Sequence, residues 1–196
     1  LGPLEKFDMD KLRTGAAQAF RKCREMEIAR AVLPLMAFEG VPGSSRDLLR
    51  EALMGGSLGL YRYTGYKTRD VDAAELPEVL LVGDEGETGG ELESLPQVVS
   101  ALSSGIGLAR DLVSAPGNVV TPGYLARKAA EIAQCHGQAL RVIPLEEART
   151  LGMGAFAAVA QGSREPACMI VMEHCPPGTE KDRPMVFVGK GITFDT

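Results

Sequence analysis

Val79-Leu-Leu-Val-Gly83 is the stretch that decides the fold class of this chain. Four consecutive large apolar residues closed by a glycine are typical of a parallel strand that is covered on both faces. Further strands are expected within residues 28–38 and at residues 140–143, 169–172 and 185–188. Strand candidates therefore recur along the whole chain.

Amphipathic helices are expected between these strands. Apolar residues recur at helical spacing over residues 10–26, with basic residues on the opposite face. Ser44, followed three residues later by an aspartate, forms a capping box that opens a second helix, which extends towards Tyr61. Gly55 and Gly56 should weaken the middle of this helix, because glycine has a low helix propensity.

The alternation continues in the second half of the chain. A long helix is expected over residues 94–112, and Thr121-Pro122 opens another with a threonine cap and a proline at the first helical position. A short helix over residues 146–151 leads into residues 152–162, to which no element is assigned. Alternating strands and helices predict an α/β fold with mixed, mainly parallel sheets flanked by helices.

An acidic, glycine-rich stretch at residues 84–93 is the best candidate for a domain boundary. We therefore expect two partial domains, residues 1–93 and residues 115–196, joined by a linker helix over residues 94–114. The chain lacks an initial methionine, and we expect it to be a fragment of a longer protein.

Composition excludes several classes of function. The net charge of −5 and the lack of a basic stripe argue against a nucleic-acid binder, so a peptide or small molecule is the expected ligand. No apolar run approaches the roughly twenty residues of a membrane helix, and no leader opens the chain, so a soluble, unexported protein is expected. Four cysteines without a CxxC pair favour reduced thiols in the cytosol.

Two Cys/His pairs raise the alternative of a zinc site. They are Cys135-His136 and His174-Cys175. Adjacent side chains do not easily point at one ion, so buried or idle thiols are the preferred interpretation. Both histidines are expected to have structural or surface roles, because neither lies in a motif that requires an imidazole.

The segment Gly189-Lys-Gly-Ile-Thr-Phe-Asp195 follows the last expected strand. Ligand sites of open α/β sheets lie beyond the carboxyl ends of strands, so this place is favoured for chemistry. The two glycines let the backbone bend tightly around Lys190, and Val188, Ile192 and Phe194 predict apolar surroundings. Desolvation favours the neutral amine, which can ligate a metal ion.

Asp195 is the natural partner of Lys190 in such a site. Its carboxylate has two oxygens, which can bridge two divalent ions that polarise a carbonyl and activate a water. Each ion needs roughly four to six donors, so several more ligands must come from elsewhere.

Spacing excludes two rival motifs and leaves a third interpretation open. A phosphate-binding P-loop would need glycine at Pro184, and a dinucleotide fingerprint would need glycine or alanine at Phe194. A surface lysine and a helix-capping aspartate after an ordinary strand remain compatible with the spacing alone.

Val188-Gly-Lys-Gly-Ile-Thr-Phe-Asp-Thr196 resembles the VGKGxTFD signature of the leucine aminopeptidase (cytosol aminopeptidase) family, which continues with serine or threonine. Other segments are similar to the same family: Leu58-Gly-Leu-Tyr-Arg62 with Tyr66-Lys67, Ala109-Arg-Asp-Leu-Val-Ser-Ala-Pro-Gly-Asn118 with Thr121-Pro122, Leu151-Gly-Met-Gly-Ala-Phe156, and Val159-Ala-Gln-Gly-Ser163. The resemblance covers nearly the whole chain, from the end of the family's amino-terminal domain into its catalytic domain.

The resemblance implies a cytosolic enzyme that removes leucine-like residues from peptides with a free amino terminus. It implies a homohexamer with two divalent ions per site, Zn, Mn or Mg. In the family, the lysine matching Lys190 ligates one metal and the aspartate matching Asp195 bridges both, and a metal-bridging water attacks the scissile carbonyl.

The family's other carboxylate ligands, its second active-site lysine and its arginine lie beyond residue 196, so no catalytic residue is assigned within this chain. The parent protein is therefore expected to be the enzyme, and residues 1–196 alone to be inactive. Some proteins of the family are DNA-binding regulators, so a non-catalytic interaction domain is the alternative.

Overall fold

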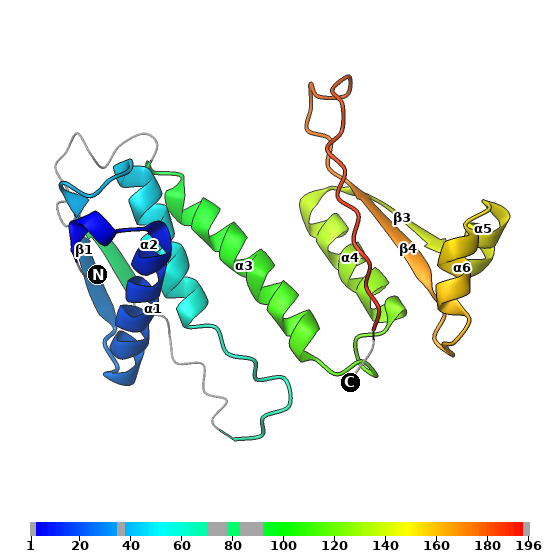
Figure 1. Cartoon of the computed structure of the whole chain (residues 1–196), viewed down its shortest axis with the longest axis horizontal. Coiled ribbons are helices and arrows are strands. Elements are labelled where there is room, and N and C mark those ends of the chain that lie inside the picture. Colours follow the sequence, from blue (N-terminus) through cyan, green and yellow to red (C-terminus); the bar gives the residue numbers. More distant parts are fainter. Residues whose placement is uncertain (1–2, 35–37, 70–77, 83–91, 194–196) are drawn as a thin grey trace. The chain divides into compact units, whose positions relative to one another are not determined.

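Figure 1 shows the computed structural model of the chain. It describes the residues in four ranges: 3–34, 38–69, 78–82 and 92–193. The chain divides into two compact units, Leu1–Ser114 and Ala115–Thr196. None of the helices that the structure describes combines the length and the apolar character needed to cross a lipid bilayer.

The first unit consists of a βαβ arrangement with a helix on either side of it in the chain. Its elements are a 3₁₀ turn at Leu4–Lys6, α1 at Met9–Glu25, β1 at Arg30–Pro34, α2 at Ser45–Gly59, β2 at Glu78–Val82 and α3 at Leu95–Ser114. β1 and β2 pair in parallel, with Val32 opposite Leu80. The expected strands at residues 28–38 and 79–82 are thus present, the first of them over Arg30–Pro34, with residues 35–37 outside the described residues.

The second unit is built around an antiparallel pair. Its elements are α4 at Pro122–His136, β3 at Ala139–Pro144, α5 at Leu145–Thr150, α6 at Gly154–Ala160 and β4 at Cys168–Glu173. Ile143 of β3 lies opposite Met169 of β4. β1 and β2 run in the same direction because the connection through α2 brings the chain back to the end of the sheet where β1 began. β3 and β4 run in opposite directions because the connection through α5 and α6 does not bring the chain back in this way. The α/β class predicted from the sequence is confirmed.

Side-chain caps begin the helices where the sequence places them. The Ser44 hydroxyl accepts a hydrogen bond from the Asp47 backbone N–H at 3.1 Å and so caps α2. Thr121 caps α4 in the same way, with the Tyr124 N–H as donor at 3.2 Å. At the other end of α4, Gly137 adopts φ 62°, a left-handed conformation that favours glycine. Both predicted caps are confirmed.

The glycines of α2 allow α1 and α2 to approach backbone to backbone. A β-carbon added at each would meet α1: at Gly55 it would lie 2.7 Å from Arg13 Cα, at Gly56 2.7 Å from the Phe20 ring, and at Gly59 2.6 Å from Ala17 Cβ. Real β-carbons do not come this close to other atoms. The low helix propensity of these glycines is therefore offset by a contact that a larger residue would prevent.

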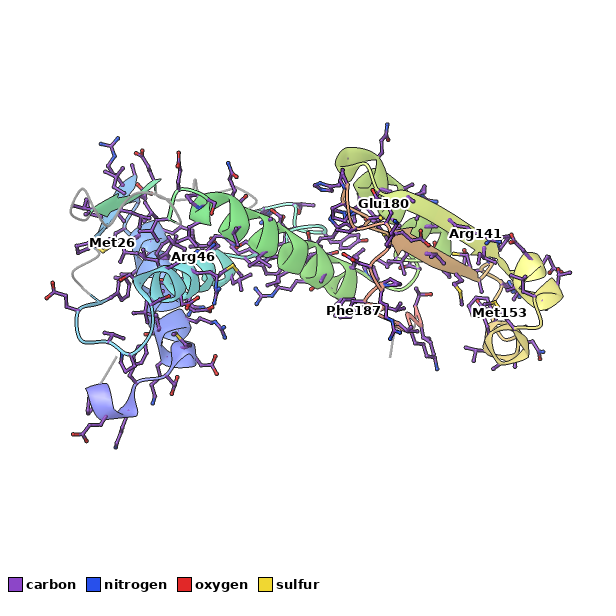
Figure 2. The ribbon with its side chains drawn as sticks, turned by 90° about the horizontal axis from the view of Figure 1, so that it is seen from above. Met26, Arg46, Arg141, Met153, Glu180 and Phe187 are labelled. Atoms are coloured by element: carbon purple, nitrogen blue, oxygen red, sulfur yellow. The ribbon has the colours of Figure 1, made fainter. Side chains whose placement is uncertain are left out.

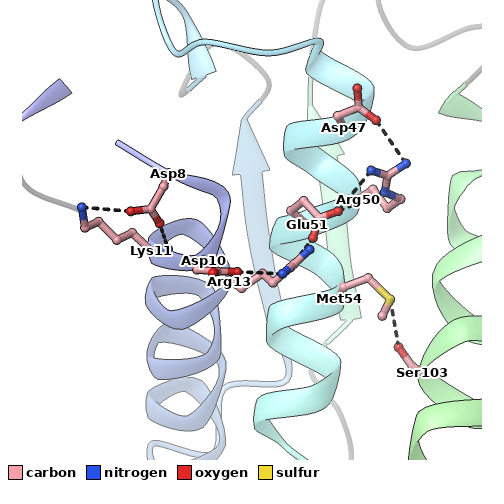
Figure 3. Close-up of polar contacts among 9 residues, drawn as sticks. All are labelled: Asp8, Asp10, Lys11, Arg13, Asp47, Arg50, Glu51, Met54 and Ser103. Atoms are coloured by element: carbon pink, nitrogen blue, oxygen red, sulfur yellow. Dashed lines mark hydrogen bonds and ion pairs between the residues drawn. The ribbon is translucent and has the colours of Figure 1, made fainter. Parts of the chain in front are cut away.

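A charged cluster crosses the same interface (Figure 3). Glu51 of α2 is buried and pairs with Arg13 of α1. Its other oxygen pairs with Arg50 at 3.1 Å, while Asp10 and Asp47 each pair with one of the arginines, at 2.8 and 3.1 Å. Burial alone raises the pKa of the Glu51 carboxyl, but the hydrogen bonds and charges of the two arginines outweigh it and lower the pKa.

The apolar core of the first unit lies between α2, α3 and one face of the sheet. Leu49 of α2 and Leu95 of α3 are fully buried, and Leu33 and Leu81 project from the strands onto the helices. Complete burial of one leucine side chain contributes about 1.5–3 kcal/mol. The core thus fixes the amino-terminal half of α3 against α2.

Polar contacts hold the carboxyl-terminal half of α3 to the end of α2. The Tyr61 hydroxyl donates to Asp111 at 2.7 Å, and Arg110 stacks over the Tyr61 ring at 5.2 Å. Arg110 also donates to the Leu58 carbonyl at 3.1 Å. Desolvation, and then the hydrogen bond to Asp111, raise the pKa of Tyr61. α3 is therefore attached by apolar contacts at one end and by polar contacts at the other.

Two segments differ from the sequence-based expectation. Residues 185–188, predicted to be a buried strand, form neither helix nor strand, and their side chains are exposed. An apolar run becomes a strand only when a neighbouring strand pairs with it, and no strand in the described ranges pairs with this run. In contrast, residues 152–162, which received no assignment, contain α6, where five of seven residues are alanine or valine.

We expect Gly55→Ala to destabilise the chain by about 1–3 kcal/mol, because its methyl group would collide with the α1 backbone. Gly105 of α3 is the matched control, since a β-carbon there meets nothing within 4 Å. Gly105→Ala should instead stabilise the chain by up to about 1 kcal/mol through helix propensity. Urea unfolding followed by circular dichroism measures both, and equal effects of the two substitutions would contradict the contact.

We expect Glu51→Gln to lower the free energy of unfolding by about 1–3 kcal/mol at neutral pH, because two arginines lose their buried partner. The folded pKa of Glu51 lies below its ordinary value of 4.5, so its contribution is present above pH 4.5 and is lost as the pH falls through the folded pKa. The difference between wild type and variant should therefore shrink in acid.

Glu25→Gln is the control for this experiment, because Glu25 makes a comparable but exposed pair with Lys22 at 3.1 Å. It should change the free energy of unfolding by less than about 0.5 kcal/mol. A difference between wild type and Glu51→Gln that stays constant from pH 7 to below pH 4 would speak against the assigned pKa.

Candidate metal centre

Lys190 lies in the coil that returns along α4 after β4 (Figure 1). The coil passes close to that helix at one point, where a β-carbon at Gly191 would lie 3.7 Å from Leu125 Cδ1. Around Gly189 no atom comes within 4 Å of the same position. The backbone before Lys190 is therefore open, whereas the backbone after it lies against α4.

The expected apolar enclosure of Lys190 is not present in this chain. Lys190 itself is exposed, and so are Val188 and Ile192, which were expected to surround it. The prediction of a desolvated amine is thus wrong for residues 1–196, because it took Val188 and Ile192 as neighbours that pack around the amine, and such packing would need residues 185–188 to lie inside a sheet. Without that sheet, the apolar neighbours point into solvent.

Asp195, like Phe194, lies outside the described residues. Among the residues that the structure does describe, no three His, Cys, Asp or Glu side chains lie together in a group that could hold a metal ion. One amine and one carboxylate do not satisfy the four to six donors that each ion requires. The donors within the described ranges therefore do not make up a complete metal centre.

Cys23 lies in the first unit, and the other three cysteines and both histidines lie in the second. All four cysteines have free thiols. The half-buried Cys168 thiol contacts the Pro122 carbonyl at 3.6 Å, and burial raises its pKa. His136 is the last residue of α4 and His174 follows β4, and both are exposed.

A turn fixes the chain between β4 and the Lys190 segment. The Thr179 hydroxyl donates to the Pro176 carbonyl at 2.7 Å, and the Asp182 N–H donates to the Thr179 carbonyl at 3.0 Å. The Glu180 carboxylate accepts from the Gly178 N–H, and backbone hydrogen bonds lower its pKa. Glu180 and Phe187, on either side of this turn's end, are labelled in Figure 2. The turn sets the point at which the coil starts back along α4.

The structure adds no further donor to the two that the sequence singled out, within the part of the chain it describes. The charged cluster around Glu51 is the main polar feature that sequence reasoning missed. The sequence did contain an indication that Glu51 is buried, because this residue falls among the apolar positions of its helix. Its neighbours there are Leu48, Leu49 and Ala52. Every partner of that carboxylate is an arginine, so it stabilises the fold rather than offering a vacant donor.

Two family models match the chain. Residues 1–70 match the cytosol aminopeptidase family, N-terminal domain, and residues 107–196 match the cytosol aminopeptidase family, catalytic domain. The second match includes Lys190 and Asp195. The two matches together cover most of the chain.

Curated relatives show the same similarity. The chain is 50% identical over 196 residues to a "probable cytosol aminopeptidase" of Syntrophobacter fumaroxidans, and 39% identical over 201 residues to one of Nitratidesulfovibrio vulgaris. All of this chain is covered in both comparisons, against 39 and 40% of the relatives. The chain thus spans about two fifths of the length of these proteins.

Solved structures resemble this chain over most of its length. A mutant of tomato leucine aminopeptidase matches with a TM-score of 0.84 and 25% identity, covering 94% of this chain and 37% of that one. The bottromycin maturation enzyme BotP in complex with Mn matches with a TM-score of 0.74 and 26% identity, covering 90 and 36%. With family models that match residues 1–70 and 107–196, and relatives aligned over the whole of this chain, the chain belongs to the cytosol aminopeptidase family.

Proposed function

We propose that the chain is part of a leucyl aminopeptidase, which hydrolyses amino-terminal residues from peptides. The observation that carries this proposal is the 50% identity along all 196 residues to a probable cytosol aminopeptidase. The catalytic-domain match reaches the segment of Lys190 and Asp195, which supports a catalytic rather than a regulatory parent. The negative net charge gives no support to the DNA-binding alternative.

Lys190 and Asp195 are proposed as two ligands of a pair of divalent ions, Zn, Mn or Mg, in the complete enzyme. An amine and a carboxylate are suitable donors, and the Mn complex of BotP supports a divalent metal in a related structure. When bound, such ions would polarise a carbonyl and activate a bridging water. The exposure of Lys190 leaves its amine accessible to a metal ion whose other donors would come from elsewhere.

The remaining features of the proposal concern the whole protein. We place residues 1–93 in its amino-terminal domain, residues 94–114 in a linker helix and residues 115–196 at the start of its catalytic domain. It would act in the cytoplasm as a homohexamer on peptides with a free amino terminus. The family's name supports the proposed cytoplasmic location, and the matches to its two domain models support the division into two domains.

Lys190→Ala and Asp195→Ala, each placed in the complete enzyme, should lower kcat/KM for a leucyl amide by more than about 100-fold. Loss of an outer partner of a ligand already costs 10–100-fold, and a direct ligand matters more. Lys181→Ala is the matched control, an exposed lysine nine positions earlier, and should stay within about twofold of wild type. Full activity of either ligand variant, with the fold intact by circular dichroism, would overturn the assignment.

Residues 1–196 alone should neither hydrolyse a leucyl amide nor bind Mn²⁺ or Zn²⁺ with micromolar affinity. The physical reason is the donor count, because two donors leave most coordination positions to water. Isothermal titration with each metal, beside a hydrolysis assay, measures both properties. Saturable micromolar binding that disappears in Lys190→Ala would show that the chain completes a metal site by itself.

A further inference from the structure

Gly191, the residue after Lys190, lies against the first turns of α4. A β-carbon at Gly191 would be 3.7 Å from Leu125 Cδ1, which is ordinary van der Waals contact. Within the described residues, no other heavy atom outside the immediate chain neighbours lies within 4 Å of that position. Figure 1 shows the same coil running alongside α4. Leu125 is therefore the side chain that the backbone next to Lys190 rests on.

The start of α4 fixes the place of Leu125. The Leu125 N–H donates to the Thr121 carbonyl at 3.0 Å, and the Thr121 hydroxyl caps the same turn by accepting from the Tyr124 N–H at 3.2 Å. The Cys168 thiol of β4 contacts the Pro122 carbonyl at 3.6 Å, which ties this first turn to the antiparallel pair. The half-buried Leu125 thus projects from a turn that is attached to the sheet.

We propose that Leu125 is a positioning residue for Lys190. Its side chain supports the backbone at Gly191 and so sets where the Lys190 amine lies. The inference rests on the proposed role of Lys190 as a metal ligand, and it names a residue on which that role depends. It does not rest on the exposure of residues 185–188, because it concerns a contact that is present within the region matched by the catalytic-domain model.

The covalent geometry of the chain carries the effect from Leu125 to Lys190. Consecutive Cα atoms are joined by a planar peptide and stay about 3.8 Å apart, so a shift at Gly191 moves Lys190 with it. An alanine at position 125 would leave a gap into which the coil could move. Ligands of a functional site must be held within about 0.5 Å of their productive geometry, so such a shift weakens metal binding.

The test is the Mn²⁺ affinity of the complete enzyme, measured by competition with a chelating dye. Leu125→Ala should raise the dissociation constant about tenfold, as loss of the support behind a metal ligand does elsewhere. Leu125→Val, a milder truncation, should raise it about threefold and carries the test if the alanine variant does not fold. Leu125→Met keeps the side-chain volume and should stay within about twofold of wild type.

The matched control is Ile132→Ala. Ile132 is also a half-buried aliphatic residue of α4, seven positions further on and thus about 10 Å along the helix axis from Leu125. Its truncation should lower the urea midpoint of unfolding by an amount comparable to that of Leu125→Ala. It should leave the Mn²⁺ dissociation constant within about twofold of wild type, because it does not support the Lys190 segment.

A double-mutant cycle tests whether Leu125 acts through Lys190. In the Lys190→Ala background, which already lacks the amine, adding Leu125→Ala should change the Mn²⁺ dissociation constant by less than about twofold. Full additivity of the two effects would mean that Leu125 acts on the site by another route, and would overturn the inference.

Two further results would overturn the inference while leaving the proposed function intact. They are wild-type Mn²⁺ affinity in Leu125→Ala and Leu125→Val, and an equal loss of affinity in Ile132→Ala. Wild-type affinity and activity in Lys190→Ala would overturn the proposed ligand itself, and the inference with it. The two failures are therefore distinguished by which single variant keeps its affinity.

Discussion

Close approach of two helices is the constraint on which the first unit depends. α1 and α2 touch backbone to backbone because α2 carries glycines where side chains would collide, and the buried Glu51 pairs with Arg13 across the same contact. The position of α2 then determines where Leu49 lies, and so where α3 and the sheet face can pack. The glycines therefore permit the close contact between α1 and α2, and the ion pair between Glu51 and Arg13 fixes how the two helices are aligned.

Local features of this fold could be predicted from the sequence, whereas tertiary ones could not. The caps at Ser44 and Thr121 depend on residues three positions apart, so the sequence contains all the information they need. Gly55 and Gly56 illustrate the limit. Their low helix propensity is evident from the sequence. Their contact with α1 is not, because no local pattern indicates where α1 lies relative to α2.

The candidate site shows the same division. The spacing of Lys190 and Asp195, and the family resemblance around them, could be recognised from residues alone. Their environment could not, because a strand at residues 185–188 requires neighbours that lie outside its own sequence. The burial of Lys190 was inferred from its apolar sequence neighbours, but Val188 and Ile192 are exposed, as Lys190 is. In residues 152–162 the error was the opposite one: no element was predicted, but the structure contains α6. A short alanine-rich helix has little hydrophobic periodicity from which it could be predicted.

The two attachments of α3 differ in their physical nature, and they should respond differently to conditions. Leu95 and Val99 anchor one end through water exclusion, which weakens on cooling and is strengthened by sulfate. Asp111 and Arg110 anchor the other end through charge-assisted hydrogen bonds, which do not depend on water exclusion. Between them, Gly105 and Gly107 lower the intrinsic helix propensity of α3. Cooling would therefore loosen the amino-terminal end of α3 before the carboxyl-terminal end.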